Sequence, residues 1–194
     1  MKILKNLEGR KIVLASKSPR RQQLIQGLGV DVEIRTKEID ESFSSSLKRE
    51  EVALYLADKK ASAFQGELAE NEILITGDTI VCLGEEILNK PENFDDAVRM
   101  LKMLSGKTHT VITAVSISDS TKSELFHGET EVQFGKLDQE EIEYYITQFH
   151  PFDKAGGYGA QDFIGYIGII DMKGSYYNVM GFPLHLVYAC LKYW

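Results

Sequence analysis

The alternation of apolar and polar residues predicts short strands and amphipathic helices that follow one another along the chain. Residues 11–15 and 73–83 are almost continuously apolar, as expected of buried strands. Alternating side chains predict half-buried strands over residues 30–36, 108–118 and 125–134. Helical spacing predicts helices that start at Pro19 and Asp138 and others over residues 49–65, 94–104 and 184–193. No internal repeat or linker interrupts this series, so we expect a single α/β domain over residues 1–194.

The polar stretch between the first strand and the first helix has the features of an anion site. Ser18 stands where an N-cap belongs, and Pro19 suits the first helical position. A helix start offers free N–H groups and the positive end of the helix dipole, to which Lys17, Arg20 and Arg21 add full charges. The alternative is a well-capped helix start that carries solvated cations.

Asp78 interrupts the most apolar strand of the chain. A buried carboxylate without partners is costly, so Asp78 should lie at a strand end, accept hydrogen bonds or lie near a cation. This makes it the best candidate for a catalytic carboxylate. The alternative is a hairpin turn at Gly77 and Asp78.

Three loop segments carry further candidate residues. Lys90 precedes Pro91 and is therefore held on extended backbone. Three glycines within residues 156–159 permit close approach to a ligand, and Gln161 follows with an amide that can both donate and accept. The plain alternatives are a surface pair of Asp153 with Lys154 and solvated acids at positions 40 and 41.

Composition limits the kind of partner. The 194 residues are 43% hydrophobic and 26% charged, with a formal charge of −7, which disfavours loose binding to nucleic acid or anionic membranes. Two distant cysteines indicate neither a disulfide scaffold nor a zinc site, and no run reaches the ~18 apolar residues of a membrane span. We expect a cytoplasmic protein.

The scattered cations indicate polyphosphate binding if they converge. Arg20, Arg21, Lys60, Lys90 and Lys154 would then clamp the phosphates, and a carboxylate would hold Mg²⁺ or accept a proton from water. The tripeptide at Gly106 is not a Walker A loop, because it ends a helix and lacks the earlier glycine. Spacing alone predicts a phosphate-binding enzyme.

Six ordered segments closely resemble the Maf family: SKSPRRQQL from Ser16, TGDTIV from Thr76, NKP from Asn89, GKTHTVITAV from Gly106, DKAGGYGAQ from Asp153 and YYNVMGFPL from Tyr176. The resemblance implies a curved mixed sheet flanked by helices, inosine triphosphatase-like, with two lobes around a nucleotide cleft. It implies a nucleoside triphosphate pyrophosphatase that uses Mg²⁺ or Mn²⁺ and releases nucleoside monophosphate and diphosphate after water attack at the α-phosphate. It also implies a homodimer.

The same resemblance implies roles for individual residues. Asp78 matches the proton acceptor and, with Glu41, would hold the metal. Arg20, Thr79 and Gln161 match the positions that select dTTP and UTP. The remaining polar pocket would consist of Ser16, Arg21, Lys60, Lys90 and Lys154.

Three positions depart from the usual pattern of that family. Gly77 stands where alanine is common, Asp162 where glycine is common and Phe182 where leucine is frequent. Asp162 puts the nucleotide preference in question more than the activity. The rival hypotheses are a non-catalytic nucleotide-binding regulator of septum formation and a pyrophosphatase for modified or purine nucleotides.

Overall fold

The computed structural model describes residues 3–194, which form two compact units. The first comprises the described residues up to Asp78 together with Thr113–Gly128 and Gly181–Trp194. The second comprises Thr79–Ile112 and Glu129–Met180. The chain therefore passes from one unit to the other directly after Asp78, within a single strand.

Seven strands of the described chain form one mixed sheet. Their hydrogen-bonded order is β2 (Val32–Ile34), β1 (Lys11–Leu14), β3 (Glu72–Leu83), β5 (Thr108–Ser118), β6 (Ser123–Phe134) and β7 (Ile169–Lys173), while β4 (Glu86–Leu88) also pairs with β3. β1 is parallel to both β2 and β3, whereas the β3–β4 and β6–β7 pairs are antiparallel. The expected mixed α/β sheet is confirmed.

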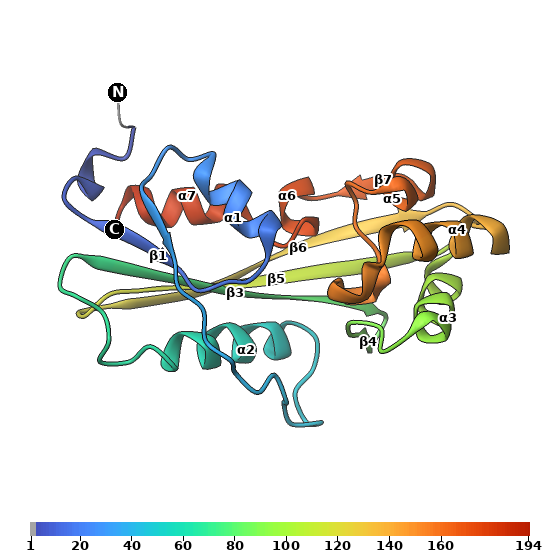
Figure 1. Ribbon diagram of the computed structural model, residues 1–194, viewed down its shortest axis with the longest axis horizontal. Coiled ribbons are helices and arrows are strands. Elements are labelled where there is room, and N and C mark those ends of the chain that lie inside the picture. The colour runs from blue at the N-terminus through green and yellow to red at the C-terminus, as the bar shows by residue number, and fades with distance from the viewer. Residues whose placement is uncertain (1–2) are drawn as a thin grey trace. The chain divides into compact units, whose positions relative to one another are not determined.

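Helices cover both faces of the sheet in the first unit. Figure 1 shows α1 (Pro19–Gln26) and α7 (Leu184–Lys192) on one face and α2 (Glu50–Ser62) on the other. A short 3₁₀ helix, η1 (Lys5–Leu7), precedes β1. Successive strand residues point to opposite faces, so Ile73 and Ile75 join the core beside α1 and α7, whereas Leu74 packs with Val13 and Phe64.

The second unit has its own hydrophobic core. It includes residues of α3 (Phe94–Leu104), α4 (Gln139–Phe149) and α5 (Phe163–Gly168), which pack with the strand residues Val81, Val111 and Phe134. Asp138 and Glu141 form a capping box at the start of α4. The remaining elements of this unit are η2 (Pro151–Asp153), η3 (Ala155–Gly157) and α6 (Tyr176–Val179).

Most predicted elements are present, and two differences bear on the sheet. The helix over residues 94–104 and the strand over residues 108–118 have the predicted bounds, whereas β2 covers only the middle of the predicted residues 30–36. β3 continues through Thr76–Thr79, so the hairpin turn considered at Gly77 and Asp78 is wrong. Within residues 3–194 no helix has the length and apolar character needed to cross a membrane.

Candidate active site

β3 turns a short polar run toward α2. Thr76 and Asp78 lie two residues apart and therefore share a face of the strand with Leu74. The Thr76 hydroxyl is buried and donates to the Ala57 carbonyl of α2 at 2.7 Å. Lys60 lies one helical turn after Ala57, and Asp78 lies two residues after Thr76. Lys60 therefore lies about 5 Å further along α2 than Ala57, and Asp78 lies about 7 Å further along β3 than Thr76. The two side chains consequently lie beside each other.

Lys60 contacts two carboxylates in the first unit. Its Nζ lies 2.5 Å from Asp78 Oδ1 and 2.7 Å from Glu41 Oε1. Asp78 is only 8% exposed, so this ammonium group is what makes the buried charge tolerable. The prediction that Asp78 must lie near a cation is confirmed, although it lies within the strand and not at its end.

Exposed acids of the loop before α2 also form ion pairs. Asp40 and Glu41 are exposed, as the plain alternative supposed, yet Glu41 contacts Lys60 and Asp40 lies 3.4 Å from Lys59. Only Glu41 thereby shares a cation with the buried Asp78.

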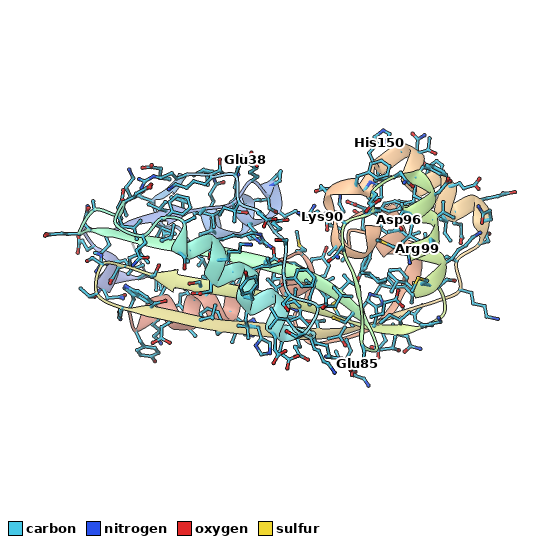
Figure 2. The ribbon with its side chains drawn as sticks, turned by 90° about the horizontal axis from the view of Figure 1, so that it is seen from below. Glu38, Glu85, Lys90, Asp96, Arg99 and His150 are labelled. Atoms are coloured by element: carbon cyan, nitrogen blue, oxygen red, sulfur yellow. The ribbon has the colours of Figure 1, made fainter. Side chains whose placement is uncertain are left out.

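The first turn of α1 forms as the sequence predicts. The Ser18 hydroxyl accepts the Arg21 N–H at 3.4 Å, and Pro19 occupies the first helical position. Ser16 is buried; its hydroxyl accepts the Ser18 N–H and its carbonyl accepts the Gln22 amide. Lys17 pairs with Glu38, which lies at the surface (Figure 2).

Arg21 fixes backbone beside Asp78. Its Nε donates to the Gly181 carbonyl at 2.7 Å and its Nη1 to the Gly77 carbonyl at 2.8 Å. Burial lowers the pKa of the guanidinium, and the nearby Asp78 carboxylate acts in the opposite direction. Arg21 is still cationic, because the pKa of an arginine lies far above neutrality. A β-carbon on Gly77 would lie 3.0 Å from the Ala114 carbonyl, so this position is tightly packed.

The second unit carries four of the predicted residues. Thr79 follows Asp78 on β3, and Lys90 lies between β4 and α3 (Figure 2). The Gly156 N–H donates to the Asn89 carbonyl at 3.0 Å, which fastens the glycine-rich loop beside Lys90. Lys154 and Gln161 lie on that loop.

Two glycines of this loop adopt backbone conformations that favour glycine, while the predicted close approach to a ligand stays a prediction. Gly156 and Gly157 have φ values of 69° and 70°, and a β-carbon on Gly156 would lie 3.1 Å from Val81. Lys154 pairs with Asp153 at 2.7 Å, yet the lysine side chain is only 12% exposed. The loop is therefore packed against the core of its unit.

Three side chains that hold this loop were not identified from the sequence: His109, Tyr145 and Tyr158. Tyr158 Oη lies 2.6 Å from His109 Nε2, and Tyr145 contacts Asp162 and Gly159. The available signal was Tyr145, which lies on the apolar face of a helix, because a buried hydroxyl needs a polar partner. The position of that partner was not readable from sequence spacing.

Asp78 and Glu41 are the residues that fit a divalent metal. Carboxylate oxygens are preferred ligands of Mg²⁺ and Mn²⁺, and Mg²⁺ commonly takes one or two carboxylates and completes its shell with water and substrate phosphates. Across residues 3–194 no group of three or more acidic, histidine or cysteine side chains could hold a metal ion. Two carboxylates, Asp78 and Glu41, are a donor set that fits such an ion.

Comparison with known proteins places the chain in a family. A sequence profile described as "Maf-like protein" matches residues 11–194. A "dTTP/UTP pyrophosphatase" of Flavobacterium psychrophilum is 50% identical over 187 residues, which are 96% of each chain. One of the same name from Phocaeicola vulgatus is 48% identical over 98% of this chain and 99% of its own.

Among solved structures, the Ham1 protein of Staphylococcus aureus is 16% identical with a TM-score of 0.45, over 64% of this chain and 72% of its own. The long, nearly full-length matches come from the sequence comparisons, and from them the chain belongs to the Maf-like protein family.

Proposed function

We propose that this protein hydrolyses dTTP and UTP to nucleoside monophosphate and diphosphate, by water attack at the α-phosphate. The observation that carries the proposal is Asp78, a buried carboxylate paired with Lys60, whose ammonium group also contacts Glu41. The chain surrounding it is about half identical, over nearly its full length, to proteins named dTTP/UTP pyrophosphatase.

Asp78 acts as the proton acceptor for the attacking water. A positioned general base contributes about 10²- to 10⁴-fold to a rate. The Lys60 ammonium group orients the Asp78 carboxylate, and the Arg21 contact with the Gly77 carbonyl fixes the backbone just before it. Arg21 thereby positions the general base, in addition to the phosphate contact that its charge at the start of the helix predicts.

Cations hold the phosphates in this proposal. Arg20 binds phosphate at the start of α1, where backbone N–H groups and the helix dipole favour an anion. The Ser16 hydroxyl, just before this helix, adds a neutral contact. Lys60, Lys90 and Lys154 add point charges that stabilise the negative charge developing on the phosphoryl oxygens.

Asp78 and Glu41 would hold Mg²⁺ or Mn²⁺, which when bound neutralises charge on the phosphate oxygens. Lys60 already bridges these two carboxylates. The lysine must therefore move or share its partners when a divalent cation binds.

Gln161 and Thr79 choose the base. Gln161 Oε1 is buried and has no hydrogen-bond partner within the described residues. An orphan buried acceptor is costly and favours a ligand that brings a donor. At the ring N3 position uracil and thymine carry an N–H donor, whereas cytosine carries an acceptor there and has its donor on the exocyclic N4, so an acceptor aimed at N3 is satisfied only by uracil and thymine. This asymmetry supports dTTP and UTP over the cytosine nucleotides.

The test is a panel of the common ribo- and deoxyribonucleoside triphosphates with Mg²⁺ or Mn²⁺. We expect turnover chiefly of dTTP and UTP, with diphosphate released. Release of orthophosphate, or no turnover of any triphosphate, would overturn the proposal. Binding without hydrolysis would favour the regulatory alternative, and preference for purine or modified nucleotides would favour the other rival.

The cytoplasmic location, the homodimer and the single-domain organisation stay predictions. Light scattering on the purified protein tests the homodimer: we expect a species of twice the chain mass, and a monomer at all concentrations would contradict it.

A further inference from the structure

The turn that carries Gln161 is closed by its own backbone. The Asp162 N–H donates to the Gly159 carbonyl at 3.0 Å, so residues 159–162 form a hydrogen-bonded turn with Gln161 at its third position. α5 begins at the next residue. The direction of the Gln161 side chain therefore depends on the conformation of this turn.

One buried hydroxyl contacts both ends of the turn. Tyr145 of α4 is fully buried, and its Oη lies 3.0 Å from the Gly159 nitrogen and 2.9 Å from Asp162 Oδ2. A backbone N–H can only donate, so the hydroxyl accepts from Gly159 and donates to Asp162. Tyr145 and Asp162 thus clamp the first and last residues of the turn.

The clamp is electrostatically consistent. Burial, and then the negative charge of Asp162, raises the pKa of Tyr145, so the phenol keeps the proton that it donates. Lys154 Nζ lies 3.8 Å from Asp162 Oδ2 and partly compensates its charge. The same carboxylate therefore links the turn to a predicted phosphate-binding lysine.

The turn has little room to adopt another arrangement. A β-carbon on Gly159 would lie 2.5 Å from Asp162 Oδ2 and 3.0 Å from Gln161 Nε2. Glycine at this position is what allows the carboxylate and the amide to pack against the turn. Within this tight arrangement Gln161 Oε1 is left without a partner in the described part of the chain.

We propose that Tyr145 and Asp162 are positioning residues for base selection, which fix the 159–162 turn so that Gln161 Oε1 meets the N3–H of uracil or thymine. This inference rests on the proposed function. A tyrosine that served only the core would need a single polar partner, whereas Tyr145 joins both ends of the turn that presents the base-reading amide.

The test compares selectivity in matched variants. Tyr145→Phe should lower kcat/KM for dTTP and UTP about tenfold, mainly through KM, because the bridging hydrogen bonds are lost. The already low kcat/KM for dCTP and CTP should change less. The discrimination ratio, which is kcat/KM for dTTP or UTP divided by kcat/KM for dCTP or CTP, therefore falls. Tyr144→Phe is the control: it removes a hydroxyl from the neighbouring residue of α4, where the side chain is 52% exposed.

Asp162 gives a second, independent arm. Asp162→Asn keeps an oxygen that can accept from Tyr145 and should retain most of the selectivity, whereas Asp162→Ala should lose it. The double variant Tyr145→Phe with Asp162→Ala should have a discrimination ratio no lower than that of either single variant, because both changes remove the same clamp. Thermal unfolding checks that each variant is folded, and if Tyr145→Phe does not fold, the two Asp162 variants decide.

The outcomes separate the two proposals. An active wild-type protein whose discrimination ratio is unchanged, within twofold, in Tyr145→Phe and Asp162→Ala would overturn the clamp but leave the proposed function intact. A wild-type protein that turns over neither dTTP nor UTP would overturn the proposed function, and the clamp with it.

Discussion

At Lys60 a single ammonium group contacts two carboxylates that come from different segments of the chain. The Lys60 and Asp78 side chains are 14% and 11% exposed, whereas Glu41 is 44% exposed. Removing one partner from a mostly buried pair costs more than the pair itself is worth, because the other charge stays behind without compensation. Lys60 is therefore expected to matter for stability as well as for catalysis.

Lys60→Gln should lower the free energy of unfolding by about 1–3 kcal/mol. Because Asp78 and Glu41 then lack their common cation, added Mg²⁺ should raise the melting temperature of this variant more than that of the wild type. Lys59→Gln is the matched control, since Lys59 contacts the exposed Asp40. Equal Mg²⁺ responses in all three proteins would count against a metal at these carboxylates.

Arg20 tests the helix start separately. Arg20→Ala should raise KM for dTTP about tenfold or more through the loss of a charge-assisted contact, with little change in melting temperature. Lys17→Ala removes a cation from the same stretch, but one that pairs with exposed Glu38, and should leave KM nearly unchanged. If Arg20→Ala also leaves KM unchanged, this stretch is only a well-capped helix start.

At the scale of elements, one hydrogen bond aligns α2 with β3. The Thr76 hydroxyl reaches the Ala57 carbonyl, and this contact places Lys60 level with Asp78. Thr76 and Asp78 break the apolar pattern of a strand whose other face packs into the core. The polar interruption of β3 therefore serves the site without ending the strand.

Thr76→Val keeps the shape of the side chain and removes this bond. We expect a loss of about 1 kcal/mol in the free energy of unfolding and a lower kcat, because Lys60 and Asp78 lose their fixed alignment. Thr36→Val, at an exposed position, should change neither quantity. A Thr76→Val protein with unaltered kcat would show that the alignment does not depend on this bond.

Local chemistry explains which elements the sequence could predict. Ser18, Pro19 and Asp138 mark helix starts through contacts within one turn, and these starts are where the structure has them. The hairpin considered at Gly77 is wrong because pairing within the sheet outweighs the local turn preference of glycine and aspartate. Tertiary pairing is not encoded in neighbouring residues.

At the scale of the whole molecule, a buried histidine in the core of the second unit should make stability depend on pH. His109 is 2% exposed, makes edge contacts with Phe134 and Tyr158, and lies within hydrogen-bond distance of the Tyr158 hydroxyl. Burial lowers the pKa of His109 to about 4 from its usual 6.5. In the folded protein the His109 imidazole thus stays uncharged until the pH falls to about 4.

Between pH 6.5 and 4 the unfolded chain binds a proton at His109 that the folded chain does not, so stability must fall as pH falls. A shift of this size corresponds to about 3 kcal/mol over the window. His109→Gln, which remains uncharged, should show a shallower decline in denaturant titrations at several pH values. Parallel curves for wild type and variant would refute the assignment.

The candidate site was predictable only in part. Asp78 was identifiable because an acid in an apolar strand needs a cation, but its partner Lys60 is 18 positions away on another element. The Tyr145–Asp162 contact likewise joins a helix to a loop. Such pairs form only when the elements pack together. Residue types and spacing could therefore identify candidate residues, but they could not show which of these residues contact each other.

The central claim is that Asp78 activates water for attack at the α-phosphate of dTTP or UTP. Its most direct test is a single turnover in H₂¹⁸O, followed by mass spectrometry of both products. We predict one ¹⁸O atom in the nucleoside monophosphate, none in the diphosphate, and turnover about 10²- to 10⁴-fold slower in Asp78→Asn. Asp58→Asn, an exposed acid of α2, should react like the wild type. Label in the diphosphate, or full activity of Asp78→Asn, would contradict the account.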